Sequence, residues 1–599
     1  MIRWKIFFCF LIPIIITLEP KEYTSIITFD ESGPSSSGSG VEIEGTEAKI
    51  ISAGEYLITG ASNEGHIVVD ISSVNIYLQN LNLTSNTTAP IIINSKLNDI
   101  SITSLGEVFL YDNELVNTTQ GECATIKIKK KSQVTFKNEN ELNLISKCKN
   151  VIKGGEESSI KFEQSNGEYI IKGYKNGISC DNYLEFNGGK FIITTDTGDA
   201  IKSDPDDTDT KSEGKIVINN GEFYIESYED GISAKKKIYI NDGIFNIKTE
   251  NGYDSTTFDK ETMSAKGLKI SNNETGSEMI IQKGEFKLNT ADDAVHSKGN
   301  LTIINGNFEI RAGDDGVHAG FNLTLGEKDT KNGPTINIYS SYEGIEGQFL
   351  DIYYANIYLN ASDDGINAAS GNGGDDPRPG PGPGPHPEPT GGPDPGPGPG
   401  PGPGPHPHPP VDNDIYIAIY DGVINVLCKG DGIDSNGAIH VHGGQINVFS
   451  QGPDEGLDNE PFDHDGNFTI YDGEILCGGN KGIEAVHEGI TKGNETFAYY
   501  MNKINVSQYL KIKDDNGKEI RQHKIPKNIG YVFYSSLNLN EKYKFYVSDT
   551  PDGKETELKF TFGKTPGKDD GGSDSPSGSN LIRINFINLI FGVMIILLL

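Results

Sequence analysis

The chain has 599 residues, a formal net charge of −34 and 72 glycines. A charge this negative argues against nucleic acid as a partner and favours divalent cations, or targets reached through them. The six cysteines are too few for a disulfide-dense scaffold. Length alone would allow three or four domains, but the repeat described below favours one elongated domain with attachments.

Residues 1–20 are predicted to be a secretory signal. Arg3 and Lys5 precede the apolar run Ile6–Leu18, as a signal peptide requires, and an uncleaved anchor is the alternative. Residues 21–40 end in Ser/Gly low complexity and are expected to form a flexible lead. Export fits the N-x-S/T sequons, which predict glycosylation in a eukaryotic secretory pathway. The ten sequon asparagines are Asn82, Asn86, Asn117, Asn273, Asn300, Asn322, Asn360, Asn467, Asn494 and Asn505.

A short phrase recurs along residues 41–370 and 413–490, and it predicts the fold. Asp292-Asp293-Ala294-Val295-His296 returns 22 residues later as Asp314-Asp315-Gly316-Val317-His318. Two alternating segments, Leu301–Ile303 and Phe308–Ile310, lie between the copies and indicate strands. Three short strands in each repeated unit are typical of a parallel β-helix. We therefore expect an all-β, right-handed parallel β-helix of more than ten coils.

Three further segments are attached to these coils. Residues 371–412 are mostly Pro-Gly and are expected to be a disordered insertion into the solenoid. Residues 491–550 break the repeat, and a hairpin pattern near Tyr509–Gly517 predicts a small C-terminal β cap. After a linker at 551–580, the hydrophobic tail 581–599 fits either a GPI-attachment signal or a transmembrane helix. The protein is therefore expected to be extracellular and held at the cell surface.

The cysteines allow one disulfide. Cys123 and Cys148 each lie three residues before a strand residue, and strands one coil apart would place their Cα atoms about 4.8 Å apart. That separation permits a disulfide, and two buried thiols are the alternative. Cys428 and Cys477 are two coils apart, about 10 Å, so we expect them not to be bonded.

The repeat in register places one column of side chains on the outer surface. If the apolar residue after each corner points inward, the next residue points outward. The outward residues predicted to bind ligand are Lys202, Lys269, His296, His318, Glu346 and Asp434. The same register adds Ser179, Ser233, Asn367, Asp458 and Glu484 to the column.

Acidic corners run beside this column. The predicted calcium ligands among them are Asp292, Asp293, Asp314, Asp315, Asp363 and Asp364. Carboxylates about 5 Å apart on successive coils repel each other, and calcium offsets this because it binds several carboxylate and carbonyl oxygens. The alternative is that these side chains only cap their own turns. His296 and His318 could bind a transition metal with Asp292 and Asp314, or remain solvated.

Five segments in this order carry a resemblance to a known family: Ala53–Asp70, Gly198–Gly221, Ala291–Ile310, Gly313–Gly320 and Tyr509–Ile520. With them the chain resembles the secreted β-helix carbohydrate-binding proteins first characterised in cellulolytic clostridia. The resemblance implies a polysaccharide-lyase-like solenoid of the pectate-lyase kind. It also implies binding of cellulose and of acidic glycans such as polygalacturonate, bound calcium, and no established catalysis. It assigns no individual calcium ligand.

We therefore expect a surface-held protein that binds polysaccharide with the help of calcium and without catalysis. A calcium-dependent polysaccharide lyase is the first alternative, and it needs a basic residue to take the C5 proton of a uronate. Lys202 and Lys269 are the bases of the column, but no motif singles them out. A structural adhesin is the second alternative.

Overall fold

The computed structural model describes residues 21–114, 123–369, 415–453, 459–480, 490–493 and 496–564. The predicted signal, the Pro-Gly insertion, the hydrophobic tail and the sequons Asn117 and Asn494 lie outside these ranges. The regular structure of the described residues consists of strands. Among them there is no helix long and apolar enough to cross a membrane.

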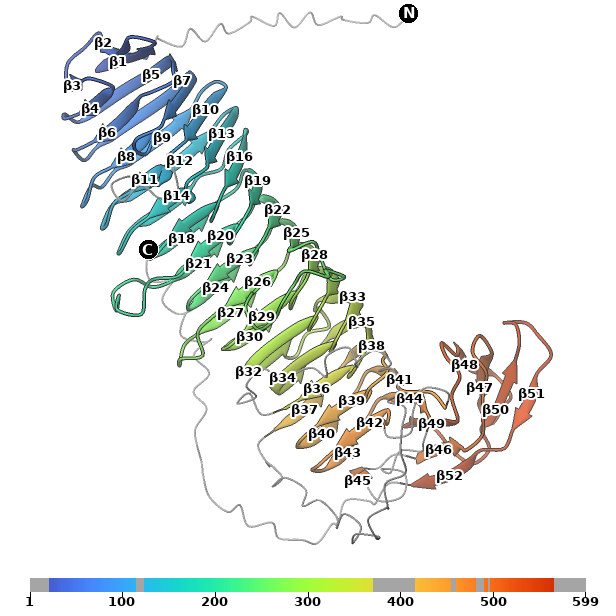
Figure 1. The fold of residues 1–599 in the computed structure, drawn as a ribbon. Coiled ribbons are helices and arrows are strands. Elements are labelled where there is room, and N and C mark those ends of the chain that lie inside the picture. Colours follow the sequence, from blue (N-terminus) through green and yellow to red (C-terminus); the bar gives the residue numbers. More distant parts are fainter. Residues whose placement is uncertain are drawn as a thin grey trace, which may run out of the picture.

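The strands wind into an elongated stack of coils that carries a separate β cap at one end (Figure 1). Each coil contributes three strands, and each strand pairs in parallel with the equivalent strand of the next coil, as β29 does with β32. The fold is therefore a parallel β-solenoid with three sheets along its length. Ile303 and Val317 are fully buried, as the predicted register requires.

The first sheet, which we name the ladder sheet, begins with the antiparallel pair β3 and β4 and then runs in parallel. Its strands are β3 (Val41–Glu44), β4 (Glu47–Ile50), β6 (His66–Val69), β8 (Ile91–Ile93), β11 (Ala124–Ile128), β14 (Asn150–Gly154), β17 (Ile178–Cys180), β20 (Ile201–Ser203), β23 (Ile232–Ala234), β26 (Leu268–Ile270), β29 (Val295–Ser297), β32 (Val317–Leu325), β34 (Ile345–Ile352), β36 (Ile366–Ala368), β39 (Ile433–Ser435) and β42 (Phe462–His464).

The second sheet shares β32 and β34, which continue into it around a corner. Its other strands are β1 (Ser25–Asp30), β2 (Gly33–Ser36), β5 (Gly54–Ser62), β7 (Val74–Ser85), β9 (Ile100–Ser104), β12 (Gln133–Asn138), β15 (Ser159–Phe162), β18 (Tyr183–Phe186), β21 (Lys215–Ile218), β24 (Lys237–Ile240), β27 (Glu278–Ile281), β30 (Asn300–Ile303), β37 (Tyr416–Ile419), β40 (Ala438–Val441), β43 (Phe468–Ile470) and β45 (Ile490–Gly493).

The third sheet starts with the second halves of β5 and β7. It continues through β10 (Val108–Asp112), β13 (Glu141–Ser146), β16 (Glu168–Gly173), β19 (Lys190–Thr195), β22 (Glu222–Ser227), β25 (Ile244–Thr249), β28 (Glu285–Thr290), β31 (Asn307–Ala312), β33 (Thr335–Ser341), β35 (Ala355–Ala361), β38 (Gly422–Leu427), β41 (Gln445–Phe449) and β44 (Glu474–Gly479). The antiparallel strands β49 (Tyr531–Ser536), β46 (Thr496–Tyr500) and β52 (Thr561–Lys564) extend it.

The cap adds a separate antiparallel sheet beyond β44. It consists of β47 (Tyr509–Lys513), β48 (Glu519–Lys524), β50 (Lys544–Ser548) and β51 (Thr556–Leu558). Two of the cap strands, β51 and β52, lie within residues 551–564, which the sequence assigns to a linker. The cap therefore extends to Lys564, and the linker begins later than expected.

Like residues stack along the interior of the coils. Phe223, Phe245, Phe286 and Phe308 lie on successive strands of the third sheet, with ring centroids 5.1, 4.7 and 4.4 Å apart. Such pairs contribute about 0.5–1.5 kcal/mol beyond the burial of their area. The corner glycine has a different role: a Cβ at Gly316 would lie 2.6 Å from the carbonyl oxygen of Gly344. Close approach of the next coil therefore favours glycine there, although Ala294 occupies the equivalent corner one coil earlier.

One stretch differs from the expected boundaries, and a second shows how the solenoid continues past the expected insertion. Residues 21–40 contain β1 and β2, an antiparallel hairpin whose first strand pairs with β5. The physical reason is the alternation of Ile27 and Phe29, which are buried despite the surrounding serines and glycines. On either side of residues 370–414, β36 and β37 both pair with β34. β36 and β37 are thus two strands of one coil, which stacks directly on the coil before it although residues 370–414 separate the two strands in the sequence.

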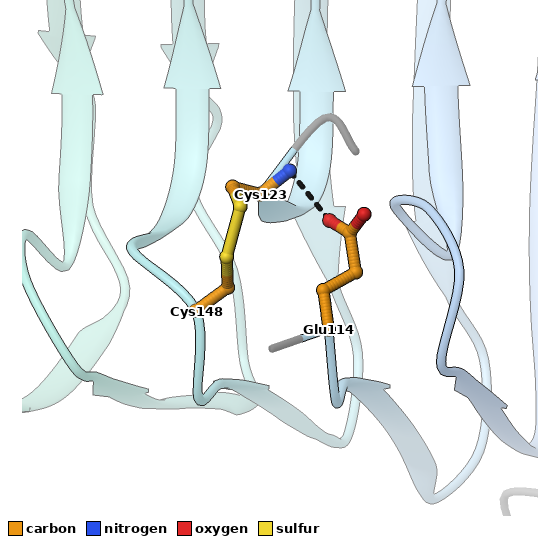
Figure 2. Close-up of side chains that lie close together, drawn as sticks. All are labelled: Glu114, Cys123 and Cys148. Carbon is orange, nitrogen blue, oxygen red and sulfur yellow. Dashed lines mark hydrogen bonds between the residues drawn. A yellow bond between two sulfur atoms is a disulfide. The ribbon is translucent and has the colours of Figure 1, made fainter. Parts of the chain in front are cut away.

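A disulfide bond links two neighbouring coils near the N-terminal end (Figure 2). Cys123 and Cys148 are bonded, with Cα atoms 5.2 Å apart, so the first of the two alternatives for this pair is correct. The buried Glu114 accepts a hydrogen bond from the backbone N–H of Cys123 at 2.6 Å. Cys428 and Cys477 are free buried thiols, as predicted, and so is Cys180.

Candidate functional site

The predicted column lies on the outer face of the ladder sheet, and we name it the ladder. Strand pairing places Lys202 beside Ser233, Ser233 beside Lys269, and Lys269 beside His296. It continues with His318, Glu346, Asn367 and Asp434. The six residues predicted to bind ligand therefore share one column, and all except the buried His296 are half-buried.

The last rungs of the ladder, after Asp434, differ from those predicted from the sequence. The rung after Asp434 is Asp463 on β42, and not Asp458. The inward residue of that rung is the buried Phe462, which follows Pro461 rather than a corner glycine. The rung therefore lacks the phrase by which the others are recognised. Asp458 and Glu484 lie outside the described residues.

The charge of the ladder changes sign along its length. Lysines occupy the early rungs at Lys127, Lys153, Lys202 and Lys269. Histidines follow at His296 and His318, and the later rungs carry Glu346, Asn367, Asp434 and Asp463. One face of the molecule thus offers a basic, an imidazole and an acidic section in sequence.

The corner aspartates cap the neighbouring coil, and not only their own turn. Asp199 Oδ1 accepts the backbone N–H of Asp230 at 3.0 Å, and Asp293 Oδ1 accepts that of Asp315 at 3.0 Å. The same bond recurs from Asp431 to Asp364 Oδ1 at 2.6 Å. Asn176 provides it with an amide oxygen, 3.0 Å from the N–H of Asp199. One carboxylate oxygen of each corner is thus used by the fold.

In the basic section, the second corner oxygen pairs with a ladder lysine. Lys202 Nζ lies 2.7 Å from Asp199 Oδ2, and Lys269 Nζ lies 2.8 Å from Asp230 Oδ2. Burial and the neighbouring Asp230 raise the pKa of Asp199 to about 6. The Asp199 carboxylate in turn helps to raise the pKa of Lys202, against the effect of burial. Lys202 is therefore held as an ammonium group, and Lys269 forms the same kind of ion pair.

Four of the predicted calcium ligands have cations supplied by the protein. Lys266 Nζ lies 2.8 Å from Asp292 Oδ1 and 2.7 Å from Asp293 Oδ2. Lys260 Nζ lies 2.6 Å from Asp314 Oδ2. Lys260 belongs to the loop between β25 and β26, which reaches the corner at Asp314. Asp315 is paired with His318, as described next, so charge repulsion alone does not require calcium here.

The two histidines repeat one arrangement on adjacent coils. His296 Nδ1 lies 2.7 Å from Asp293 Oδ2, and His318 Nδ1 lies 3.0 Å from Asp315 Oδ2. His318 Nδ1 is also 2.7 Å from Glu346 Oε2. Burial and the nearby Lys266 lower the pKa of His296 to about 3. The two carboxylates have the opposite effect on His318, whose pKa is raised well above its usual range although partial burial acts to lower it.

The acidic section has no such cations. Asp364 Oδ1 and Asp431 Oδ1 cap backbone N–H groups, the latter that of Glu460 at 2.5 Å. No lysine, arginine or histidine among the described residues pairs with Asp363, Asp364, Asp431 or Asp434. Burial and neighbouring carboxylates raise the pKa of Asp364 to about 7 and that of Asp434 to about 8. Burial likewise raises the pKa of Asp431 to about 6. This section is therefore the one that lacks a compensating charge.

The described sequons lie on the surface. The asparagines of seven of them are exposed: Asn82, Asn86, Asn273, Asn322, Asn360, Asn467 and Asn505. Asn300 is half-buried, and its Oδ1 accepts a hydrogen bond from Asn322 Nδ2 at 2.8 Å. All eight are on the outside of the solenoid or the cap.

Comparison with known proteins adds an independent finding. Residues 44–316 match a family model described as "Carbohydrate-binding domain-containing protein". Over these residues, the chain is similar to carbohydrate-binding domains. The match includes the basic section of the ladder and His296, ends before His318, and supports polysaccharide as the partner.

A solved structure is also similar. The polysaccharide lyase-like protein from C. thermocellum, in a gadolinium derivative, is 23% identical over 38% of this chain and 92% of its own, with a TM-score of 0.33. No curated protein matches the chain.

Proposed function

We propose that this protein binds polysaccharide along the ladder, without catalysis, and with calcium bound in the acidic section. The observation that carries the proposal is the unbroken column of polar side chains on one face, which overlaps the region similar to carbohydrate-binding domains. An extended polymer fits such a column because each rung offers another polar side chain. The handedness of the coils belongs to the same expectation, and we infer that they are right-handed.

Calcium would be held by Asp364, Asp431 and Asp434, with Asp363 and Asp463 beside them. Calcium prefers several oxygen ligands from carboxylates and carbonyls, and this section offers carboxylate oxygens without protein cations. Asp363 and Asp364 belong to the set predicted from the sequence. We do not extend the proposal to Asp292, Asp293, Asp314 and Asp315, because lysines and histidines already neutralise them.

The ion pairs of the basic section favour binding over lyase chemistry. A lyase base must accept a proton from the substrate. Lys202 is paired with Asp199, and its raised pKa disfavours the neutral amine. Lys269 is likewise paired with Asp230. Ion-paired lysines of this kind suit the recognition of acidic sugars.

The proposal extends to the location of the protein. A cleaved signal, glycosylation at the exposed sequons and a C-terminal anchor would together place it outside the cell and attached to its surface. The ladder would then face the extracellular space, where polysaccharides are available.

The decisive experiment measures retention and cleavage together. The secreted protein is incubated with insoluble cellulose and with polygalacturonate, in calcium and then in chelator. We expect retention of the protein, loss of polygalacturonate binding in chelator, and no rise in ultraviolet absorbance from unsaturated uronate. Asp434→Asn should weaken polygalacturonate binding. Asp472→Asn is the control, because Asp472 is exposed on a turn away from the ladder and caps only Gly473.

Two results would contradict the proposal. A rise in absorbance that disappears in Lys202→Ala or Lys269→Ala would establish a lyase. A protein that is retained by neither polymer, in calcium or in chelator, would favour the structural adhesin.

A further inference from the structure

The imidazole section contains a pair of nitrogen atoms that the proposed function does not use. His296 and His318 are directly paired on β29 and β32, with ring centroids 4.8 Å apart and planes tilted by 33°. In each residue, Nδ1 is directed at the aspartate three residues earlier. Because the two coils repeat this geometry, both Nε2 atoms lie on the ring edge that faces away from the aspartates.

His296 is held ready to donate a lone pair. Its ring is 7% exposed, and Nε2 has no hydrogen-bond partner in the described part of the chain. Its contact with the Asp293 carboxylate places the proton on Nδ1, since a carboxylate accepts hydrogen bonds. Nε2 is then an unprotonated acceptor in a buried place, which a folded protein rarely leaves without a partner.

We propose that His296 and His318 bind a divalent transition-metal ion such as Zn²⁺ through their Nε2 atoms. A histidine that ligates a metal commonly donates its other N–H to a carboxylate, which fixes the tautomer and orients the ring. Both histidines already have this arrangement, with Asp293 and Asp315 as the carboxylates. Imidazole suits Zn²⁺, Cu²⁺ and Ni²⁺, whereas calcium takes oxygen ligands. The site is therefore distinct from the acidic section.

Spacing supports the same assignment. A ring nitrogen of His296, a ring nitrogen of His318 and a carboxylate oxygen of Asp293 lie within 4.8 Å of one another. The two rings are therefore close enough to share one ion.

The ion has a route of entry and room for further ligands. The His318 side chain is 25% exposed, which leaves one side of the pair accessible from solvent. Two imidazole ligands leave coordination positions for water or for an oxygen of a bound partner.

Titration of the full secreted protein with Co²⁺ tests the proposal, because Co²⁺ substitutes for Zn²⁺ and absorbs visible light. His386, His406 and His408 are first changed to Gln in every protein to remove the histidines of the Pro-Gly stretch. We expect one equivalent of Co²⁺ to bind and to be displaced by Zn²⁺ but not by millimolar Ca²⁺. His296→Gln and His318→Gln should each weaken binding at least tenfold, and Asp293→Asn about tenfold or more. His440→Gln on the second sheet is the matched control and should bind as the parent does.

Equal affinity in the His296→Gln, His318→Gln and control proteins would overturn the proposal, as would displacement of Co²⁺ by Ca²⁺. Circular dichroism and the melting midpoint verify that each variant is folded. If His296→Gln does not fold, the more exposed His318→Gln decides. Asp364→Asn separates this site from the proposed calcium site, because it should change the response to calcium and leave Co²⁺ binding unchanged.

Discussion

Lys266 Nζ lies between Asp292 Oδ1 and Asp293 Oδ2, at 2.8 and 2.7 Å. Lys266 occupies a corner at which neighbouring coils carry an acidic residue, such as Asp230 and Asp293. A single basic corner therefore neutralises the acidic corner that follows it. The side chains of all three residues are largely buried, so the pair is shielded from solvent.

Replacing Lys266 by Met should strongly destabilise the solenoid. The change leaves Asp292 and Asp293 buried without their cation, and breaking a buried pair in this way costs about 3–5 kcal/mol. Urea unfolding at neutral pH measures the loss. Lys283→Met is the control, because Lys283 and its partner Asp242 are exposed, and exposed pairs contribute less than about 1 kcal/mol. Equal midpoints for the two variants would contradict the role of Lys266.

Asp364→Asn with Asp431→Asn should remove the response to calcium but keep the fold. Asn176 already caps its neighbour with an amide oxygen, so asparagine preserves the corner bond while removing the charge. At free calcium a hundredfold above the dissociation constant, binding stabilises the parent by about 2.7 kcal/mol, which shifts the melting midpoint by a few degrees. The variant should melt at the same temperature in calcium and in chelator. A parent whose midpoint is the same in calcium and chelator, and which contains no calcium by elemental analysis, would refute the calcium proposal.

The cap should lose stability in acid because of His523. Its ring stacks on Phe449 with centroids 5.2 Å apart, and burial together with Arg521 lowers its pKa to about 4. The unfolded pKa is about 6.5, so the folded state disfavours the protonated form. The contribution is present above pH 6.5 and is lost as the pH falls towards 4, up to about 3 kcal/mol. His523→Phe keeps the stack, and urea unfolding between pH 4 and 7 should show a weaker pH dependence than in the parent.

Removing the disulfide should destabilise the N-terminal coils. Cys123 and Cys148 are 25 residues apart, and closing a loop of this size stabilises a protein by about 3 kcal/mol. The double change to Ala should lower the denaturation midpoint to that of the reduced parent. Cys180→Ala is the control, because Cys180 is a free thiol and this variant should remain sensitive to reductant. A parent that is insensitive to reductant would contradict the prediction.

Deletion of Phe586–Leu599 should release the protein into the medium. This prediction rests on the uncharged apolar segment at the C-terminus, which follows a spacer of small residues. Phospholipase C then separates the two anchors on intact cells: release supports GPI, and retention supports a transmembrane helix. A deleted protein that stays on the cells would exclude both.

The sequence was sufficient for the coils and for the ladder register, because both follow from a fixed period. Val295 and Val317 point inward, so His296 and His318 must follow on the outer face. The coil at Phe462 was not predicted because Pro461 replaces the corner glycine by which the other coils are recognised. The hairpin β1–β2 was not predicted because Ile27 and Phe29, the alternating apolar residues of its first strand, lie in a stretch rich in serine and glycine.

The charge balance of the site could not be predicted in the same way. The corner bonds join residues of different coils, and their spacing varies with the loops between them. Lys260 reaches Asp314 from the loop between β25 and β26, and nothing in the local sequence indicates where that loop turns. The lysine at corner 266 was visible in the sequence, but its partners Asp292 and Asp293 belong to the next coil.

The coil that contains β36 and β37 stacks directly on the coil before it, and this has a mechanical consequence. The final described rungs and the cap are joined to the rest of the solenoid through the hydrogen bonds of β34 with β36 and β37 and of β35 with β38. A pulling force along the long axis, as on a protein tethered by its C-terminus while its ladder grips a polymer, would be borne by these bonds. The number of residues in the segment 370–414 would not alter the distance between the two ends of the ladder. This segment can therefore vary in length without displacing the rungs that contact the polymer.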